Sequence, residues 1–285
     1  MAPIIASLSA NSFSSSGGVL VPEQFDSMLV GAGGYNSGGG AGGIISFTDA
    51  NGATGSGYSF NNSQWDLRGV FTVTVGASGS GDIGGSSQID AYNSSGTLVT
   101  GAKQIAYGGG RGGTYDSDYG RNGASGGGGY GCLCPASGGT AYTGIGYGPY
   151  YGVQGHAGGT GYRDCCWLNY WGGGGGFSSS GSNAASGTHG TGGGGTDPNN
   201  SVHADQFWLG ISDNSSYNGR FSRGWNHNQG SAGQPGDGGG YAGVVAIRYD
   251  NIYDDPVVTG SPNFYDDTTN NKRIIVWTGA GTFQW

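Results

Sequence analysis

Runs of glycine constrain this chain more than any other feature of its sequence. Glycine supplies 68 of the 285 residues, where an average protein has ~7%. The longest glycine-rich runs lie at residues 31–43, 108–113, 126–129, 172–176, 192–195 and 236–243. Each glycine held in regular structure costs roughly 0.5–1 kcal/mol relative to alanine. A folded chain of this kind must therefore gain stability from close backbone contacts that only glycine permits.

Two interpretations of the glycine runs are open at this point. A collagen-like fold is excluded, because no strict Gly-X-Y period is present and the chain has only 8 Pro. One interpretation is packed helices of polyproline II type, which make no internal hydrogen bonds and must find partners sideways. The other interpretation is flexible linkers.

The remaining composition favours a folded all-β protein. Leu, Ile, Val and Phe together fall below ~20%, which on its own is typical of disorder. Against this, 18 Tyr, 10 Phe and 7 Trp are spread along the chain, and only 10% of the residues are charged, whereas disordered chains usually carry many charges. Because no apolar repeat of helical period extends beyond one turn, we expect little or no helix.

Short apolar runs between Gly, Asn and Ser predict the strands. In residues 70–75, Phe71, Val73 and Val75 alternate with Thr72 and Thr74, so this strand is expected to have one buried and one wet face. The other expected strands lie at residues 25–30, 44–47, 98–107, 244–249, 274–278 and 282–285. We predict an N-terminal arm or attachment segment at 1–24, a glycine-rich domain at 25–249, and a connector with a C-terminal β arm at 250–285.

Charge and hydropathy exclude several classes of partner. The net charge is −8, and the 10 Lys and Arg are scattered singly, so no basic stripe is present to bind nucleic acid. No stretch approaches the ~18 apolar residues of a membrane helix. The first residues, MAPIIASLSANSF, lack the basic region of a signal peptide.

The order of several segments resembles the glycine-rich domain of bacteriophage tail-fibre and tail-tip proteins. The segments are FDSMLVGAGGYNSGGGAGG, FTVTVGASGSGDIGGSSQI, IAYGGGRGG, a long glycine-rich middle and GDGGGYAGVVAIRY. The resemblance covers about residues 25–249. In that family a segment similar to RIIVWTGAGTFQW precedes the glycine domain, whereas here it follows it. The glycine runs between the TVTVG and VVAIRY strands favour a scaffold: a glycine-rich β-sandwich-like domain with packed polyproline II-type glycine helices.

The layout is also similar to adhesins at the fibre tips of T-even-like phages. This resemblance implies a non-enzymatic virion protein, without a cofactor, assembled in the bacterial cytoplasm and exposed on the particle. It implies a host surface glycan or outer-membrane protein as partner, contact with other virion proteins, and a homotrimer or a trimeric fibre as the assembly. The insertions at 115–121, 132–151, 162–171 and 199–227 would then face the bacterium. The alternative is a purely structural subunit, such as a capsid decoration, a connector or a glycine-rich extracellular filament.

Aromatic residues in these insertions are the candidate receptor-binding residues, because exposed rings stack on sugars or anchor proteins. They are Tyr142, Tyr147, Tyr150, Tyr151, Trp167, Tyr170, Trp171, Trp208, Tyr217 and Trp225. The competing interpretation is that these rings cover the glycine segments as part of the core.

Other reactive side chains give no catalytic motif. The four cysteines, Cys132, Cys134, Cys165 and Cys166, lack the usual C-x₂₋₄-C spacing, and disulfides, buried free thiols and a metal site all stay open. The pairs Asp254–Asp255 and Asp266–Asp267 offer oxygen ligands for a cation such as calcium, but solvated turns explain them as well. Without a nucleophile elbow or a carboxylate cluster, we expect no enzyme.

Overall fold

The computed structural model describes residues 19–46, 59–61, 68–79, 83–115, 119–131, 136–142, 154–163, 169–194, 224, 235–268 and 271–285. This part of the chain is all-β, and it contains no helix that could cross a membrane. The strands are β1 (Gln24–Val30), β2 (Ile44–Ser46), β3 (Ser59–Asn61), β4 (Val70–Thr74), β5 (Ser87–Tyr92), β6 (Leu98–Ala106), β7 (Tyr162–Arg163), β8 (Asn169–Tyr170), β9 (Val244–Asp250), β10 (Val257–Val258), β11 (Asn263–Asp267), β12 (Lys272–Trp277) and β13 (Gly281–Gln284).

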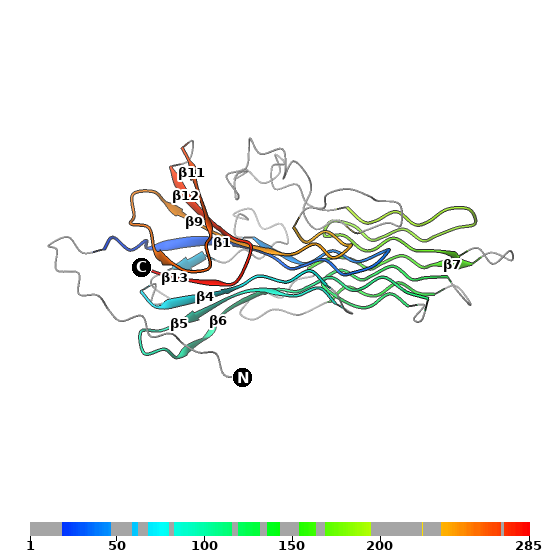
Figure 1. Ribbon diagram of the computed structural model, residues 1–285, viewed down its shortest axis with the longest axis horizontal. Helices are drawn as coiled ribbons and strands as arrows, with labels where there is room; N and C mark the ends of the chain where they lie inside the picture. The colour runs from blue at the N-terminus through cyan, green and yellow to red at the C-terminus, as the bar shows by residue number, and fades with distance from the viewer. Residues whose placement is uncertain are drawn as a thin grey trace.

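The strands form three antiparallel sheets. The first sheet has the order β11-β12-β9-β1-β2, and β3 also pairs with β1. The second sheet has the order β10-β13-β4-β5-β6, and β7 pairs with β8 in a separate two-stranded sheet. Figure 1 shows the two larger sheets together at one end of an elongated molecule.

Aromatic side chains fill the space between the two larger sheets. Phe71 of β4 lies opposite Phe283 of β13 in the register, and their rings stack with centroids 4.6 Å apart. Phe25 of β1 meets both rings edge-on, at 5.3 Å and 5.5 Å. Trp277 of β12 and Leu29 of β1 are fully buried in the same cluster. The two sheets therefore pack face to face as a sandwich with an aromatic core.

The other face of the first sheet is buried as well. Met28, Val30, Val244 and Ile274 belong to a second apolar cluster on this face. Such near-continuous burial explains why β9 (VVAIRYD) shows an apolar run instead of an alternating pattern.

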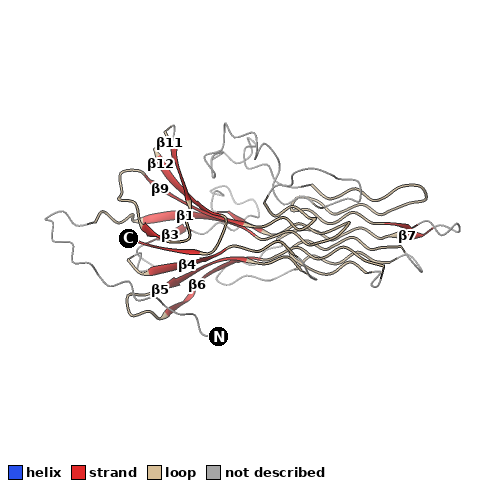
Figure 2. Cartoon of the chain, in the orientation of Figure 1, coloured by secondary structure: helices blue, strands red, loops and turns tan. Residues whose placement is uncertain are grey.

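The glycine tracts continue the strands of the sandwich along the long axis. One tract joins β1 to β2 and another joins β4 to β5, while a third follows β6 and a fourth leads into β9. In Figure 2 the strands run into parallel, undulating tan segments that extend along the long axis. Most glycines of the described tracts are buried, and the tracts are hydrogen-bonded to one another, so they are part of the packed fold.

Hydrogen bonding between tracts repeats every three residues. The N–H groups of Gly109 and Gly112 donate to Ala32 and Tyr35 of one neighbouring tract. The N–H groups of Gly110 and Gly113 donate to Ser125 and Gly128 of another tract. The same spacing recurs elsewhere; for example, the N–H groups at 126 and 129 donate to the carbonyls at 156 and 159, and those at 173 and 176 to the carbonyls at 182 and 179. Each tract therefore bonds several neighbours in turn, unlike a β-strand, which bonds only the two beside it.

The tracts lie too close together for side chains. A Cβ placed on Gly108 would lie 1.6 Å from the carbonyl oxygen of Gly84, and one on Gly33 would lie 1.7 Å from that of Asp237. A Cβ on Gly128 would lie 2.0 Å from the oxygen of Gly172. Glycine is required at these positions because the neighbouring backbone occupies the space of a side chain.

Two buried polar side chains join the sandwich to the glycine tracts. The Ser87 hydroxyl donates to the carbonyl of Val30 at 2.6 Å and accepts the N–H of Gly76 at 2.9 Å. The Gln154 amide accepts the N–H of Tyr107 at 2.8 Å and donates to the carbonyl of Ile105 at 2.9 Å. Both side chains satisfy backbone groups where strand pairing ends.

The predicted strands are confirmed within one or two residues of their ends, and Phe71 and Val73 are buried as expected while Thr74 is exposed. Four strands lie beyond residue 250, where the sequence predicts a connector and a C-terminal β arm. These strands lie within the two sheets, since β12 pairs with β9 and β13 pairs with β4 of the same chain.

Candidate binding site at the distal end

The β7–β8 pair lies at the end of the long axis opposite the two larger sheets, and we call this the distal end (Figure 1). Tyr162 of β7 lies opposite Tyr170 of β8 in the register, and Arg163 lies opposite Asn169. Tyr130 from another tract forms a bridge with Trp171, the residue after β8. Residues far apart in the sequence therefore meet at this end.

Six aromatic rings form a connected row there, which we call the distal cluster: Tyr115, Tyr130, Tyr162, Tyr170, Trp171 and His189. Tyr130 and Trp171 stack with ring centroids 4.5 Å apart and an interplanar angle of 27°. His189 lies 5.3 Å from Trp171 and 5.4 Å from Tyr170. Tyr115 extends the row beyond Tyr130 at 6.5 Å, and Tyr162 extends it beyond Tyr170 at 6.4 Å.

Hydrogen bonds hold the inner rings of the distal cluster in place. The His189 Nδ1 atom accepts the backbone N–H of Trp171 at 3.0 Å, so this nitrogen carries no proton. The Asn169 amide donates to the Tyr130 hydroxyl at 3.0 Å. Backbone bonds from Gly190 to Trp171 and from Gly172 to Gly129 attach the same segments to the glycine tracts. The rings are therefore positioned before any partner arrives.

Exposure of the rings increases toward the outside of the row. Tyr130 is buried, Tyr162, Tyr170, Trp171 and His189 are half-buried, and Tyr115 is 76% exposed. Between residues 107 and 194, the described part of the chain contains no Val, Leu, Ile or Met.

The structure brings only some of the predicted receptor-binding residues together. Tyr170 and Trp171 belong to the distal cluster, whereas Tyr142 packs edge-on at 5.9 Å against Tyr107, which directly follows β6 near the sandwich. The other seven lie outside the described residues: Tyr147, Tyr150, Tyr151, Trp167, Trp208, Tyr217 and Trp225. Cys132, Cys134, Cys165 and Cys166 lie outside them too.

Tyr130 and His189 were not predicted as members of this site, and Tyr115 and Tyr162 were predicted only as the first residues of the insertions at 115–121 and 162–171. Each of them is an isolated residue beside a glycine run, and they do not form a cluster in the sequence. A signal was nevertheless present, because a large ring beside a segment that excludes side chains must lie at the end or the surface of the packed tracts.

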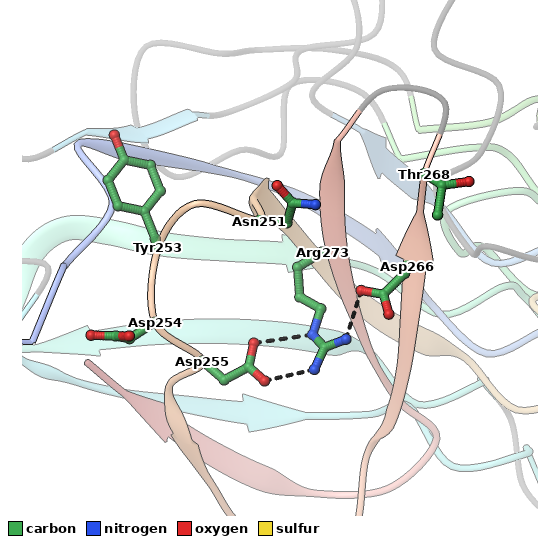
Figure 3. Close-up of a pocket in the computed structure, with 7 residues that line it drawn as sticks. All are labelled: Asn251, Tyr253, Asp254, Asp255, Asp266, Thr268 and Arg273. Carbon is green, nitrogen blue, oxygen red and sulfur yellow. Dashed lines mark hydrogen bonds and ion pairs between the residues drawn. The ribbon is translucent and has the colours of Figure 1, made fainter.

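A second candidate site is an open pocket of about 490 Å³ at the sandwich end, lined by Asn251, Tyr253, Asp254, Asp255, Asp266, Thr268 and Arg273. Figure 3 shows the Asp255 and Asp266 carboxylates directed at the Arg273 guanidinium. Arg273 donates to both oxygens of Asp255, at 3.0 Å and 2.7 Å, and to Asp266 at 2.6 Å. The pocket therefore contains an ion-pair network in which two carboxylates share one cation.

The pKa values of Asp255 and Arg273 are shifted in the directions that keep both groups charged and so favour the ion pair. Hydrogen bonds from Arg273 hold the pKa of Asp255 below its usual range. The bond to Asp255 in turn raises the pKa of Arg273. Burial, together with the 2.7 Å hydrogen bond that its hydroxyl donates to Asp255, raises the pKa of Tyr249. Asp255 and Arg273 therefore stay charged over the neutral range, and the Tyr249 phenol stays neutral.

Metal ligation finds no support at this pocket. Among the described residues, no three His, Cys, Asp or Glu side chains are grouped so that they could hold a metal ion. Asp255 and Asp266, two of the carboxylates that the sequence suggested as calcium ligands, bind Arg273 instead.

In comparisons with known proteins, no family model, no curated protein and no solved structure matches the chain.

Proposed function

We propose first that the glycine tracts are packed helices of polyproline II type. The polyproline II helix has three residues per turn and no internal hydrogen bonds. Hydrogen-bond donors three residues apart in one tract, such as Gly109 and Gly112, reach the same neighbour. The carbonyls that crowd the missing Cβ positions support the same conformation. Such packing makes a scaffold that is stiff and nearly free of side chains.

We propose further that the protein is a bacteriophage virion component, a tail-fibre or tail-tip adhesin that binds a receptor on the bacterial surface. The main support for this proposal is the position of the distal cluster, which lies at the opposite end of the elongated scaffold from the sandwich. Recognition residues are often held on connecting segments by a rigid framework. The sandwich end then joins other virion proteins, as part of a homotrimer or on a trimeric fibre.

One observation favours the alternative of a purely structural subunit. Tyr130, at the centre of the row, is only 6% exposed, so part of the distal cluster covers the ends of the glycine tracts. The exposure of the outer rings supports the adhesin, because a covering role does not require Tyr115 to be 76% exposed.

Binding of the labelled full chain to a panel of bacterial strains tests the proposal. We expect at least one strain to bind, and we expect Tyr115→Ala combined with Tyr162→Ala to weaken that binding. Tyr35→Ala is the matched control, because Tyr35 is 50% exposed and lies at a turn between tracts, with its ring near Gly240. Thermal unfolding of each variant shows whether it is folded. If no strain binds, or if the double variant binds as well as the unaltered chain, the structural alternative replaces the adhesin.

A further inference from the structure

We propose that the distal cluster binds a carbohydrate, a glycan of pyranose sugars on the cell surface, and not a protein. This inference rests on the proposed function and specifies the receptor class of that same site. The observations that carry it are the chemical composition of the distal surface, the exposure of the outer rings and the rigidity of their supports.

The composition of the distal surface suits sugars. Sugar rings present patches of C–H groups bordered by hydroxyls, and aromatic faces with phenol hydroxyls at their edges match both features. Tyr115, Tyr162 and Tyr170 provide such amphipathic rings, whereas Tyr130 already accepts a hydrogen bond from Asn169.

The sandwich end provides the contrast. Its exposed apolar side chains include Val19, Leu20, Ile252 and Val257, which are 54–70% exposed. Exposed apolar side chains of this kind suit the core of a protein interface, which is more apolar than its rim. Among the described residues, these exposed aliphatic side chains lie at the sandwich end, whereas the exposed phenol ring of Tyr115 lies at the distal end.

The rigidity of the distal cluster matters because sugars offer little apolar area per contact. A ligand that gains little free energy from each contact binds measurably only if the site loses little conformational entropy on binding. Tyr162 and Tyr170 lie on paired strands, and the Trp171 backbone is fixed through its N–H by His189 and through its carbonyl by Gly190. The row of rings is therefore a preformed platform on which consecutive sugar units can stack.

The experiment uses the full chain and a strain to which it binds. The probes are the lipopolysaccharide and the capsular polysaccharide purified from that strain, added as soluble competitors. We expect one of them to displace the protein from cells. Removing one stacking ring costs about 0.5–1.5 kcal/mol, so Tyr115→Ala and Tyr162→Ala should each weaken binding to that polysaccharide by about 2- to 12-fold. Tyr115→Phe, which keeps the ring, should lose less than Tyr115→Ala, and Tyr35→Ala should bind as the unaltered chain does.

The outcomes separate this inference from the proposed function. If the variants weaken cell binding but neither polysaccharide competes, and protease treatment of the cells abolishes binding, the receptor is a protein and the carbohydrate inference is wrong while the adhesin stands. If the polysaccharide competes equally well against the unaltered chain and both alanine variants, the distal cluster is not the site. If no strain binds at all, the proposed function itself fails.

Discussion

Alanine in place of a packed glycine gives a direct measure of how closely the tracts approach one another. Gly109 is buried, and a Cβ on it would lie 2.0 Å from the oxygen of Gly40 and 2.5 Å from that of Ala41. Those two oxygens accept hydrogen bonds from Gly34 at 2.8 Å and from Ser125 at 3.1 Å. Gly109→Ala must therefore separate the tracts and strain or break both bonds.

The expected loss follows from these contacts. Overpacking costs typically 1–3 kcal/mol, and two weakened hydrogen bonds add about 0.5–1.5 kcal/mol each. The free energy of unfolding should fall by about 2–6 kcal/mol, which for a chain of 285 residues lowers the melting temperature by about 3–10 °C. Calorimetry or urea denaturation measures the change.

Gly279→Ala is the matched control. A Cβ at Gly279 meets no atom within 4 Å, and both substitutions restrict the unfolded chain to the same extent. The control should change the stability by less than about 1 kcal/mol, so the difference between the two variants reports only the folded state. Equal stability of the two variants would refute the close packing of the tracts.

Three further predictions concern the sandwich and its ion pairs. Ser87→Ala leaves the carbonyl of Val30 and the N–H of Gly76 without their side-chain partner. Urea denaturation should show that the free energy of unfolding falls by about 2 kcal/mol or more. An unchanged denaturation midpoint would mean that this junction does not contribute to stability. Phe283→Ala removes a fully buried ring stacked on Phe71. The free energy of unfolding should fall by about 3–5 kcal/mol in the same assay. A fall of less than about 1 kcal/mol would contradict the stacked core. Because the pKa of Asp255 is lowered in the folded state, its stabilising effect is present above the unfolded Asp pKa of about 3.9 and is lost as the pH falls through the lower folded value. Melting temperatures of the unaltered chain and Asp255→Asn should therefore converge on acidification below about pH 4, and a constant difference down to pH 2 would argue against the ion pair.

The sequence predicts those strands in which a strongly apolar set of side chains alternates or forms a continuous run. Phe71 and Val73 marked β4, and the VVAIRY run marked β9. β5 was missed although Ile89 and Ala91 alternate with polar residues, because Asp and Ser within SQIDAY weaken its strand propensity. β11 was missed for a related reason, since NFYDD is an exposed edge strand and edge strands tolerate charges.

The pairing of the glycine tracts could not be predicted from the sequence. Side chains normally specify which segments pair and in which register, and glycine has none. The three-residue spacing of donors becomes visible only once the partners are known, as with Gly110 and Gly113. The distal cluster depends on that pairing, so the tract arrangement, and not the local sequence, brings Tyr130 beside Trp171.

The position of β13 sets the order in which this protein can fold during synthesis. Phe71 is made early, but the strand that covers it, with Phe283 directly opposite, is made more than 200 residues later. Until residues 281–284 leave the ribosome, β4 has an open edge and its aromatic side chain lacks the ring on which it stacks. Exposed strand edges and apolar surface make such intermediates prone to aggregation. A prematurely terminated chain can therefore make every glycine tract and still lack a closed core, so completion of the sandwich is also a check that translation has reached these residues.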